Sequence, residues 1–153
     1  MNAIELLKQD HEKVDKLFQQ VKAEQGDQAQ LAEQIRQELE VHTQIEEQIF
    51  YPYLLENGDE EIQDIVKEGI EEHRQAKSLL KQIQGLAEES DSLDPKLQVL
   101  MEDVEHHVQE EEGEMFPKVQ EQFDEEILND LGQQLEEMKS KLMGGKSSGA
   151  SGR

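Results

Sequence analysis

The amino-acid sequence predicts an all-α protein: an up-and-down antiparallel four-helix bundle with an additional C-terminal helix. Apolar residues recur every three or four positions through most of the chain, which is the spacing of one buried helix face. Glycine and proline are sparse until the C-terminal end, and short turn signals divide the chain into long segments. Charged residues make up 34% of the sequence and aromatic residues 4%, a composition typical of helical proteins. Because the apolar residues are periodic, the low hydrophobicity does not indicate disorder.

Two turn signals delimit the first three helices. Gly26-Asp27 separates a helix expected over 3–24 from one expected over 28–56. Asn57-Gly58-Asp59 separates the second helix from a third over 60–89. The short connections make successive helices antiparallel neighbours.

A third turn signal, Ser90-Asp91-Ser92, precedes the fourth helix, which is expected over 95–120. Asp94 is the expected N-cap of this helix, and Pro95 is its expected first helical residue. Proline suits that position because the first turn of a helix leaves its N–H groups without helical partners.

The remaining sequence predicts a fifth helix over 124–143, with Asp124 as its cap and Gly144-Gly145 at its end. Leucines mark one side of this helix and it has no histidine, so we expect it to pack against the outside of the bundle. The predicted domain covers residues 1–143, and 144–153 reads as a flexible Gly/Ser-rich tail.

Each of the first four helices carries a histidine on its apolar stripe, where an apolar residue is expected. In an antiparallel pair, two residues equidistant from the connecting turn lie at the same level. Each successive pair of these histidines satisfies that condition, so we expect four imidazoles to meet in one layer halfway along the bundle. The four residues are His11, His42, His73 and His107.

Buried imidazoles need partners for their ring nitrogens, and metal ions are the natural partners of convergent neutral imidazoles. Glu46 follows His42 by four residues and Glu111 follows His107 by four, so each carboxylate lies on the same helix face as its histidine. The segments 42–52 and 107–117 also repeat His, Gln, Glu, Glu and Pro at identical offsets. Two copies of one ligand-bearing element suit two metals bridged by two carboxylates. The alternative is a polar layer of histidines hydrogen-bonded to glutamates without metal.

The sequence also suggests roles for residues near the expected ligands. His106 is expected on the surface, since a step of one residue turns a helix by about 100°. Tyr51 and Tyr53 are interpreted as helix-end packing residues. Gly69 lies on the inward stripe, where it either allows close helix packing or leaves space beside the metals for a small ligand. Four acidic residues are expected to lie around the ligands, where one of them could orient a histidine by accepting its second ring N–H: Glu12, Glu47, Glu72 and Glu112.

Charge and composition restrict the partners. The formal net charge is -22, which repels nucleic acid and anionic membrane surfaces, so neither is expected as a partner. The absence of cysteine excludes a thiolate metal site, a catalytic cysteine and a disulfide framework. The sequence shows no signal-peptide pattern and no apolar stretch near the ~20 residues that span a membrane, so we expect a cytoplasmic protein.

The histidine and glutamate pattern resembles the hemerythrin-like family with its HHE cation-binding motifs, over residues 1–143. That family has a histidine on helix one, H-x-x-x-E on helix two, a histidine on helix three and H-x-x-x-E on helix four. The resemblance implies a non-haem di-iron centre with the histidines as terminal ligands, bridging carboxylates from Glu46 and Glu111, and an oxo or hydroxo bridge. Histidine and carboxylate ligands would also suit zinc or manganese.

One departure separates the sequence from the oxygen-carrying members, which have a second histidine on the third helix where Gly69 stands here. Their helix-four carboxylate would correspond to Glu112. The sequence instead resembles the bacterial six-ligand variant. The resemblance then implies a centre that binds dioxygen, nitric oxide or peroxide for sensing, scavenging or catalase-, peroxidase- or oxidase-like turnover. Alternatives are iron storage, delivery or iron-centre repair, and a bundle that its metal only stabilises.

Overall fold

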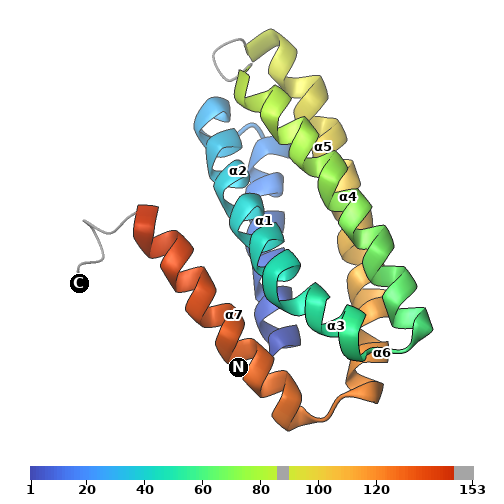
Figure 1. Ribbon diagram of the computed structural model, residues 1–153. Helices are drawn as coiled ribbons and strands as arrows, with labels where there is room; N and C mark the ends of the chain where they lie inside the picture. The colour runs from blue at the N-terminus through green and yellow to red at the C-terminus, as the bar shows by residue number, and fades with distance from the viewer. Residues whose placement is uncertain (86–89, 147–153) are drawn as a thin grey trace.

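The computed structural model describes residues 1–85 and 90–146, and these residues confirm the all-α bundle (Figure 1). Two stretches of π-helix, η1 and η2, interrupt the second and fourth long helices. The elements in chain order are α1 (Ala3–Lys22), α2 (Gln28–Ile45), η1 (Glu46–Phe50), α3 (Tyr51–Asn57), α4 (Glu60–Gly85), α5 (Ser90–Glu110), η2 (Glu111–Met115), α6 (Phe116–Gln122) and α7 (Glu125–Lys146).

Side-chain caps fix where several helices begin. Asn2 and Glu5 form a reciprocal capping box at the start of α1. Asp27 accepts a hydrogen bond from the backbone N–H of Ala29 at 3.0 Å, and it thereby caps α2. The predicted cap of the last helix is confirmed, since Asp124 accepts from the N–H of Ile127 at 3.0 Å.

The predicted start of the fourth helix is wrong. α5 begins at Ser90, so Ser90-Asp91-Ser92 is the first turn of the helix and Pro95 lies inside it. Near a helix start, proline removes only one backbone hydrogen bond, and the helix continues across it. The preceding helix, predicted to reach 89, is described as α4 as far as Gly85; residues 86–89 lie outside the described part of the chain.

At the C-terminal end, α7 runs to Lys146, past the predicted end at Gly144-Gly145. Glycine lowers helix propensity by only about 1 kcal/mol, and here it does not end the helix. Residues 147–153 lie outside the described residues, and the flexible tail stays a prediction. None of the helices in the described residues has the length and hydrophobicity needed to cross a membrane.

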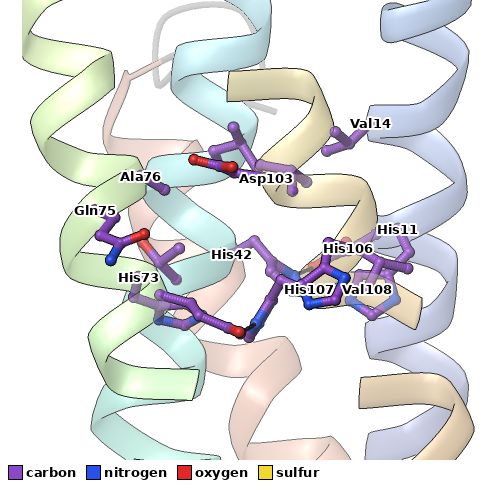
Figure 2. A pocket seen from close by; sticks show the side chains of 15 residues that line it. His11, Val14, His42, His73, Gln75, Ala76, Asp103, His106, His107 and Val108 are labelled. Atoms are coloured by element: carbon purple, nitrogen blue, oxygen red, sulfur yellow. Dashed lines mark hydrogen bonds and ion pairs between the residues drawn. The ribbon is translucent and has the colours of Figure 1, made fainter. Parts of the chain in front are cut away.

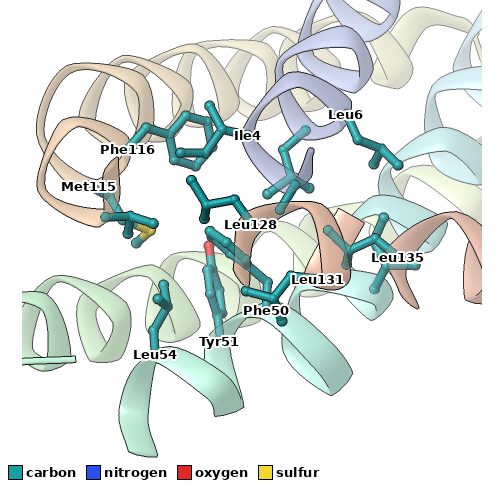
Figure 3. Packing of buried hydrophobic residues seen from close by; sticks show 14 of the residues in the cluster. Ile4, Leu6, Phe50, Tyr51, Leu54, Met115, Phe116, Leu128, Leu131 and Leu135 are labelled. Carbon is teal, nitrogen blue, oxygen red and sulfur yellow. The ribbon is translucent and has the colours of Figure 1, made fainter. Parts of the chain in front are cut away.

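The fifth helix completes the core at one end of the bundle. α7 runs alongside α1 and α2 (Figure 1). Leu128, Leu131 and Leu135 are almost fully buried among residues of α1, η1 and α3 (Figure 3). The backbone of the N-terminus approaches Gly132 so closely that a Cβ there would lie 2.3 Å from the carbonyl oxygen of Met1. The expectation that this helix packs on the outside of a finished bundle is therefore incomplete.

Two hydrophobic clusters form the core, and a layer of buried polar side chains separates them. One cluster joins the start of α1 to η1, α3, α6 and α7. The other joins the second halves of α1 and α4 to the first halves of α2 and α5. His11, His42, Glu46, His73 and Glu111 lie between the two clusters and are all buried.

Candidate metal centre

The structure brings together all six residues that the sequence predicts as ligands. α1, α2, α4 and α5 each contribute one histidine, and the glutamates are the first residues of η1 and η2. The imidazole rings of His11 and His42 have centroids 5.0 Å apart, and those of His73 and His107 are also 5.0 Å apart. Glu46 and Glu111 are 0% and 1% exposed. The four histidines therefore lie at one level, as equal distances from the turns predicted, although α5 begins earlier than predicted.

Each glutamate divides its two oxygens between two histidines. Glu46 Oε2 lies 3.4 Å from His42 Nε2, and Glu46 Oε1 lies 3.0 Å from His73 Nε2. Glu111 Oε1 lies 3.1 Å from His11 Nε2, and Glu111 Oε2 lies 3.5 Å from His107 Nε2. The eight donor atoms thus form two groups, and each carboxylate contributes one oxygen to each group. This is the arrangement that two carboxylates bridging two metal ions require.

The first group consists of His11, His42, Glu46 and Glu111, whose donor atoms all lie within 4.8 Å of one another. Its four atoms, His11 Nε2, His42 Nε2, Glu46 Oε2 and Glu111 Oε1, are buried and lack a hydrogen-bond partner in the described residues. The nitrogens and oxygens are close, yet they are not aligned to bond one another. Buried polar atoms without partners are costly, so this geometry fits donors directed at a common cation.

In the second group, donor atoms of Glu46, His73 and His107 lie within 4.8 Å of one another. Glu111 Oε2 adjoins this group through His107, and the hydroxyl of Tyr51 lies among these donor atoms. Tyr51 Oη donates to Glu111 Oε2 at 2.5 Å and lies 3.2 Å from Glu46 Oε1. The same oxygen is 3.4 Å from His73 Nε2 and 3.5 Å from His107 Nε2. Tyr51 is therefore a candidate additional metal ligand. Its ring packs in the hydrophobic core as predicted, but the prediction is incomplete because it missed the role of the hydroxyl.

The π-helical segment explains why the sequence pattern missed Tyr51. An α-helical stripe from Glu46 passes through Ile49 and Tyr53, but both of these side chains are only partly buried. In η1 the backbone N–H of Tyr51 bonds the carbonyl of Glu46, five residues earlier, so Tyr51 faces inward instead. Pro52 follows at once and has no N–H for an α-helical bond, which was the available sequence signal.

The second π-segment places a residue without a hydroxyl in the matching position. In η2 the N–H of Phe116 bonds the carbonyl of Glu111, as Tyr51 does with Glu46. The ring of Phe116 stacks on that of His11, with centroids 6.1 Å apart and planes 3° apart. The repeated sequence elements thus give two similar groups of donor atoms that differ by one neighbouring hydroxyl.

Gly69 provides the space for Tyr51. A Cβ at Gly69 would lie 3.3 Å from Tyr51 Oη and 3.4 Å from a carbon of the His107 ring. The space that the sequence interpretation reserved for an exogenous ligand at this position thus adjoins the tyrosine hydroxyl. A larger side chain would displace Tyr51 from the second group.

A carboxylate contacts the second ring nitrogen of every histidine in the layer. Asp10 lies 2.9 Å from His42 Nδ1, and Glu47 lies 2.7 Å from His73 Nδ1. Such contacts fix the ring orientation and direct Nε2 at the metal. The other two carboxylates are Glu112 on His11 and Glu72 on His107.

Three of the four acidic residues suggested by the sequence occupy these positions, whereas Glu12 is exposed. Asp10 was missed. Its signal was its place on the buried stripe of α1, three residues after Leu7, where a carboxylate needs a partner. Lys139 of α7 supplies a second partner by donating to the other oxygen of Asp10.

The charges in the layer stabilise one another. Burial opposes protonation of His42, but Glu46 and Asp10 outweigh burial and raise its pKa to about 10. Burial likewise opposes protonation of His107, while Glu111 and Glu72 raise its pKa to about 11. Burial disfavours the ionised Glu111, yet His107 and His11 hold its pKa well below the usual value. Without metal, protons on the imidazoles therefore balance the carboxylates, and metal ions must displace those protons.

A cavity of about 150 Å³ adjoins this layer and is bordered by all four histidines (Figure 2). It lies on the opposite side of the layer from Tyr51, among residues of the second hydrophobic cluster. The sequence did not indicate such a pocket. His106 contributes to its rim, and the His106 side chain is 67% exposed, as expected for a surface residue.

An antiparallel helical bundle with buried histidine and carboxylate donors on facing helices defines a class, the metal-binding helical bundle proteins. The chain belongs to the hemerythrin HHE cation binding domain family, whose model matches residues 2–119. Family membership and the donor groups together make it a metal-binding protein.

Two relatives add to this assignment. A hemerythrin HHE cation binding domain-containing protein from Mycobacterium kansasii has the same fold, with a TM-score of 0.79 and 23% identity, over 95% of this chain and 89% of that one. A protein from Nostoc sp. (strain PCC 7120) described as a DNA nickase is 26% identical over 98% of this chain. The alignment covers 43% of the Nostoc protein, so the present chain spans less than half of that relative.

Proposed function

We propose that the protein holds two iron ions and that the pair reacts with a small oxidant or diatomic ligand, above all peroxide. His11, His42, Glu46 Oε2 and Glu111 Oε1 would hold one ion. His73, His107, Glu46 Oε1, Glu111 Oε2 and Tyr51 would hold the other. The observation that carries the proposal is the division of both carboxylates between two histidine pairs, with four buried donor atoms left without partners.

When bound, such a pair supplies two electrons and positions at which dioxygen, nitric oxide or peroxide binds. The protein residues supply the rest. Four carboxylates on the Nδ1 atoms hold the imidazoles in place. Tyr51 holds a proton on Oη next to Glu111, within the second group of donor atoms. The cavity gives a small ligand a path from the surface to the histidine layer. Peroxide is favoured because its O–O cleavage needs both two electrons and protons.

The test is metal analysis followed by spectroscopy of the untagged protein. We expect two irons per chain, and absorption changes when the reduced protein meets hydrogen peroxide, dioxygen or nitric oxide. His107→Gln should lose at least one iron, whereas the neighbouring His106→Gln, the matched control, should keep both. Rapid transfer of the iron to a metal-free acceptor protein would favour a function in iron storage or delivery. Inert zinc would favour a structural metal, and absence of metal would refute the proposal.

We also propose that nucleic acid is not a partner of this chain, in contrast to what the description of the Nostoc relative suggests for that protein. The support is the formal net charge of -22, which repels a polyanion. Retention of labelled duplex DNA by the iron-loaded protein at low salt, or nicking of a supercoiled plasmid, would contradict this.

A further inference from the structure

We propose that the cavity beside the histidine layer binds the apolar part of a small organic hydroperoxide, whose peroxide group then reaches the metal pair. The inference rests on the proposed function and adds the substrate class. It would make the centre selective for alkyl hydroperoxides over hydrogen peroxide.

The size of the cavity is the first argument. Its volume is about 150 Å³. A dry apolar cavity of about that volume is known to accommodate benzene. tert-Butyl hydroperoxide has as many non-hydrogen atoms as benzene, so a ligand of this size fits, whereas hydrogen peroxide would leave most of the space empty.

The chemistry of the walls is the second argument. Beyond the histidines, five aliphatic side chains from all four long helices line the cavity, and they offer no hydrogen bond to a ligand. The polar side chains of Asp10, Thr43 and Glu72 also line the cavity. The aliphatic side chains would contact an alkyl group favourably, whereas hydrogen peroxide has no apolar part to bury against them. The five are Val14, Leu39, Ala76, Val104 and Val108.

The direction of the cavity is the third argument. Figure 2 shows Val14 and Ala76 on one side of the ring of histidines, so the apolar walls lie beyond the metal ligands. Gln75, Asp103 and His106 are exposed and lie where the cavity meets the surface between α4 and α5. A ligand entering there would place its alkyl group against the walls and its oxygens against the histidine layer.

The reaction is a two-electron reduction in a single turnover: ROOH + 2 e⁻ + 2 H⁺ → ROH + H₂O. The O–O bond breaks, and each oxygen ends with the protons that make an alcohol and a water. The electrons would come from the reduced iron pair of the proposed function, and the protons would come from solvent.

The experiment uses the iron-loaded protein and two readouts. Calorimetric titration with benzene measures cavity binding independently of redox chemistry. Stopped-flow oxidation of the reduced protein measures half-saturating concentrations for tert-butyl hydroperoxide and for hydrogen peroxide. We expect benzene to bind at one site and to compete with tert-butyl hydroperoxide. The half-saturating concentration of tert-butyl hydroperoxide should be at least about tenfold lower than that of hydrogen peroxide.

Matched variants locate the effect. Val104→Phe should fill the cavity, abolish benzene binding and raise the half-saturating concentration of tert-butyl hydroperoxide at least about tenfold. Val99→Phe makes the same change on the same helix at a side chain that is 46% exposed, and it should change neither quantity. Ala76→Leu, which fills the cavity from α4, repeats the test if Val104→Phe does not fold.

Absence of benzene binding would overturn the inference, and so would equal effects of Val104→Phe and Val99→Phe. If hydrogen peroxide oxidises the centre while tert-butyl hydroperoxide does not, the inference fails and the proposed function stands. If neither peroxide oxidises an iron-loaded centre, both fail.

Discussion

At the scale of single residues, Tyr51 and Phe116 make the two metal positions unequal. They occupy matching places one residue before Pro52 and Pro117, at the C-terminal end of each repeated element. Tyr51 Oη contacts four donor atoms of the second group, whereas Phe116 stacks on His11 and has no hydroxyl to offer the first group. In the proposed two-iron centre, the position nearer Phe116 would therefore have fewer protein ligands and would be the better place for an exogenous one.

This asymmetry predicts the effect of Tyr51→Phe. The oxidised, iron-loaded wild type should show a visible band from charge transfer between a tyrosinate and iron, and the variant should lose it while keeping two irons per chain. Phe116→Tyr is the mirror-image control and should keep the band. Retention of the band in Tyr51→Phe would show that Tyr51 does not bind iron, and loss of both irons would show a larger structural role.

At the scale of helices, the π-segments explain which parts of the site the sequence could predict. Helical periodicity and equal distances from turns predicted the four histidines and both glutamates, because these precede or begin the π-segments. Beyond Glu46 each residue is rotated relative to an α-helix, so Ile49 and Tyr53 are half-buried while Phe50 and Tyr51 are fully buried. Helical periodicity gives no signal for a π-helical segment. The interior prolines were the available signal in the sequence.

Contacts that depend on tertiary packing could not be predicted from the sequence, for a different reason. The role of Asp10 depends on α7, which brings Lys139 against it. The level argument treats only pairs of helices joined by one turn, so it says nothing about how a fifth helix crosses α1 and α2. The cavity could not be predicted for the same reason, because the side chains that line it come from all four long helices.

α7 is therefore expected to tune the metal centre through Lys139 and Asp10. Burial disfavours the ionised Asp10, but His42 and then Lys139 lower its pKa. Lys139→Met should weaken this carboxylate's hold on His42 and reduce metal affinity about tenfold, near the lower end of effects seen when partners of ligands are changed. Competition with a chelator measures it. Lys141→Met, at an exposed position on the same helix, is the control, and equal affinities in the two variants would argue against the link.

At the scale of the whole molecule, the metal centre joins the two halves of the core. The polar layer separates two hydrophobic clusters, and without metal its charged carboxylates depend on protonated imidazoles for balance. Bound metal stabilises the folded state alone, by about 2.7 kcal/mol for each ion present at a hundred times its dissociation constant.

Metal removal should therefore lower thermal stability. For a chain of this length, two ions at that saturation correspond to a melting temperature higher by about 10–20 °C. Calorimetry before and after chelation under reducing conditions measures the difference, and adding iron back should restore it. His106→Gln, outside the layer, should lose as much on chelation as the wild type. An unchanged melting temperature would mean that the metals contribute nothing to the fold.

The metal-free protein should also respond to pH in a defined direction. The pKa values of His42 and His107 rise to about 10 and about 11 in the folded chain, from an ordinary value of 6.5. Groups with raised pKa values stabilise the folded state fully below pH 6.5, and the contribution is lost as pH rises through 10. Urea unfolding with chelator present should show stability falling across this window. In the iron-loaded protein the imidazoles are already deprotonated by the metals, so the slope should be smaller. His42→Phe should reduce the dependence of the metal-free protein's stability on pH. If the stability of the metal-free protein stays constant or rises between pH 6.5 and 10, the exchange of protons for metal ions is contradicted.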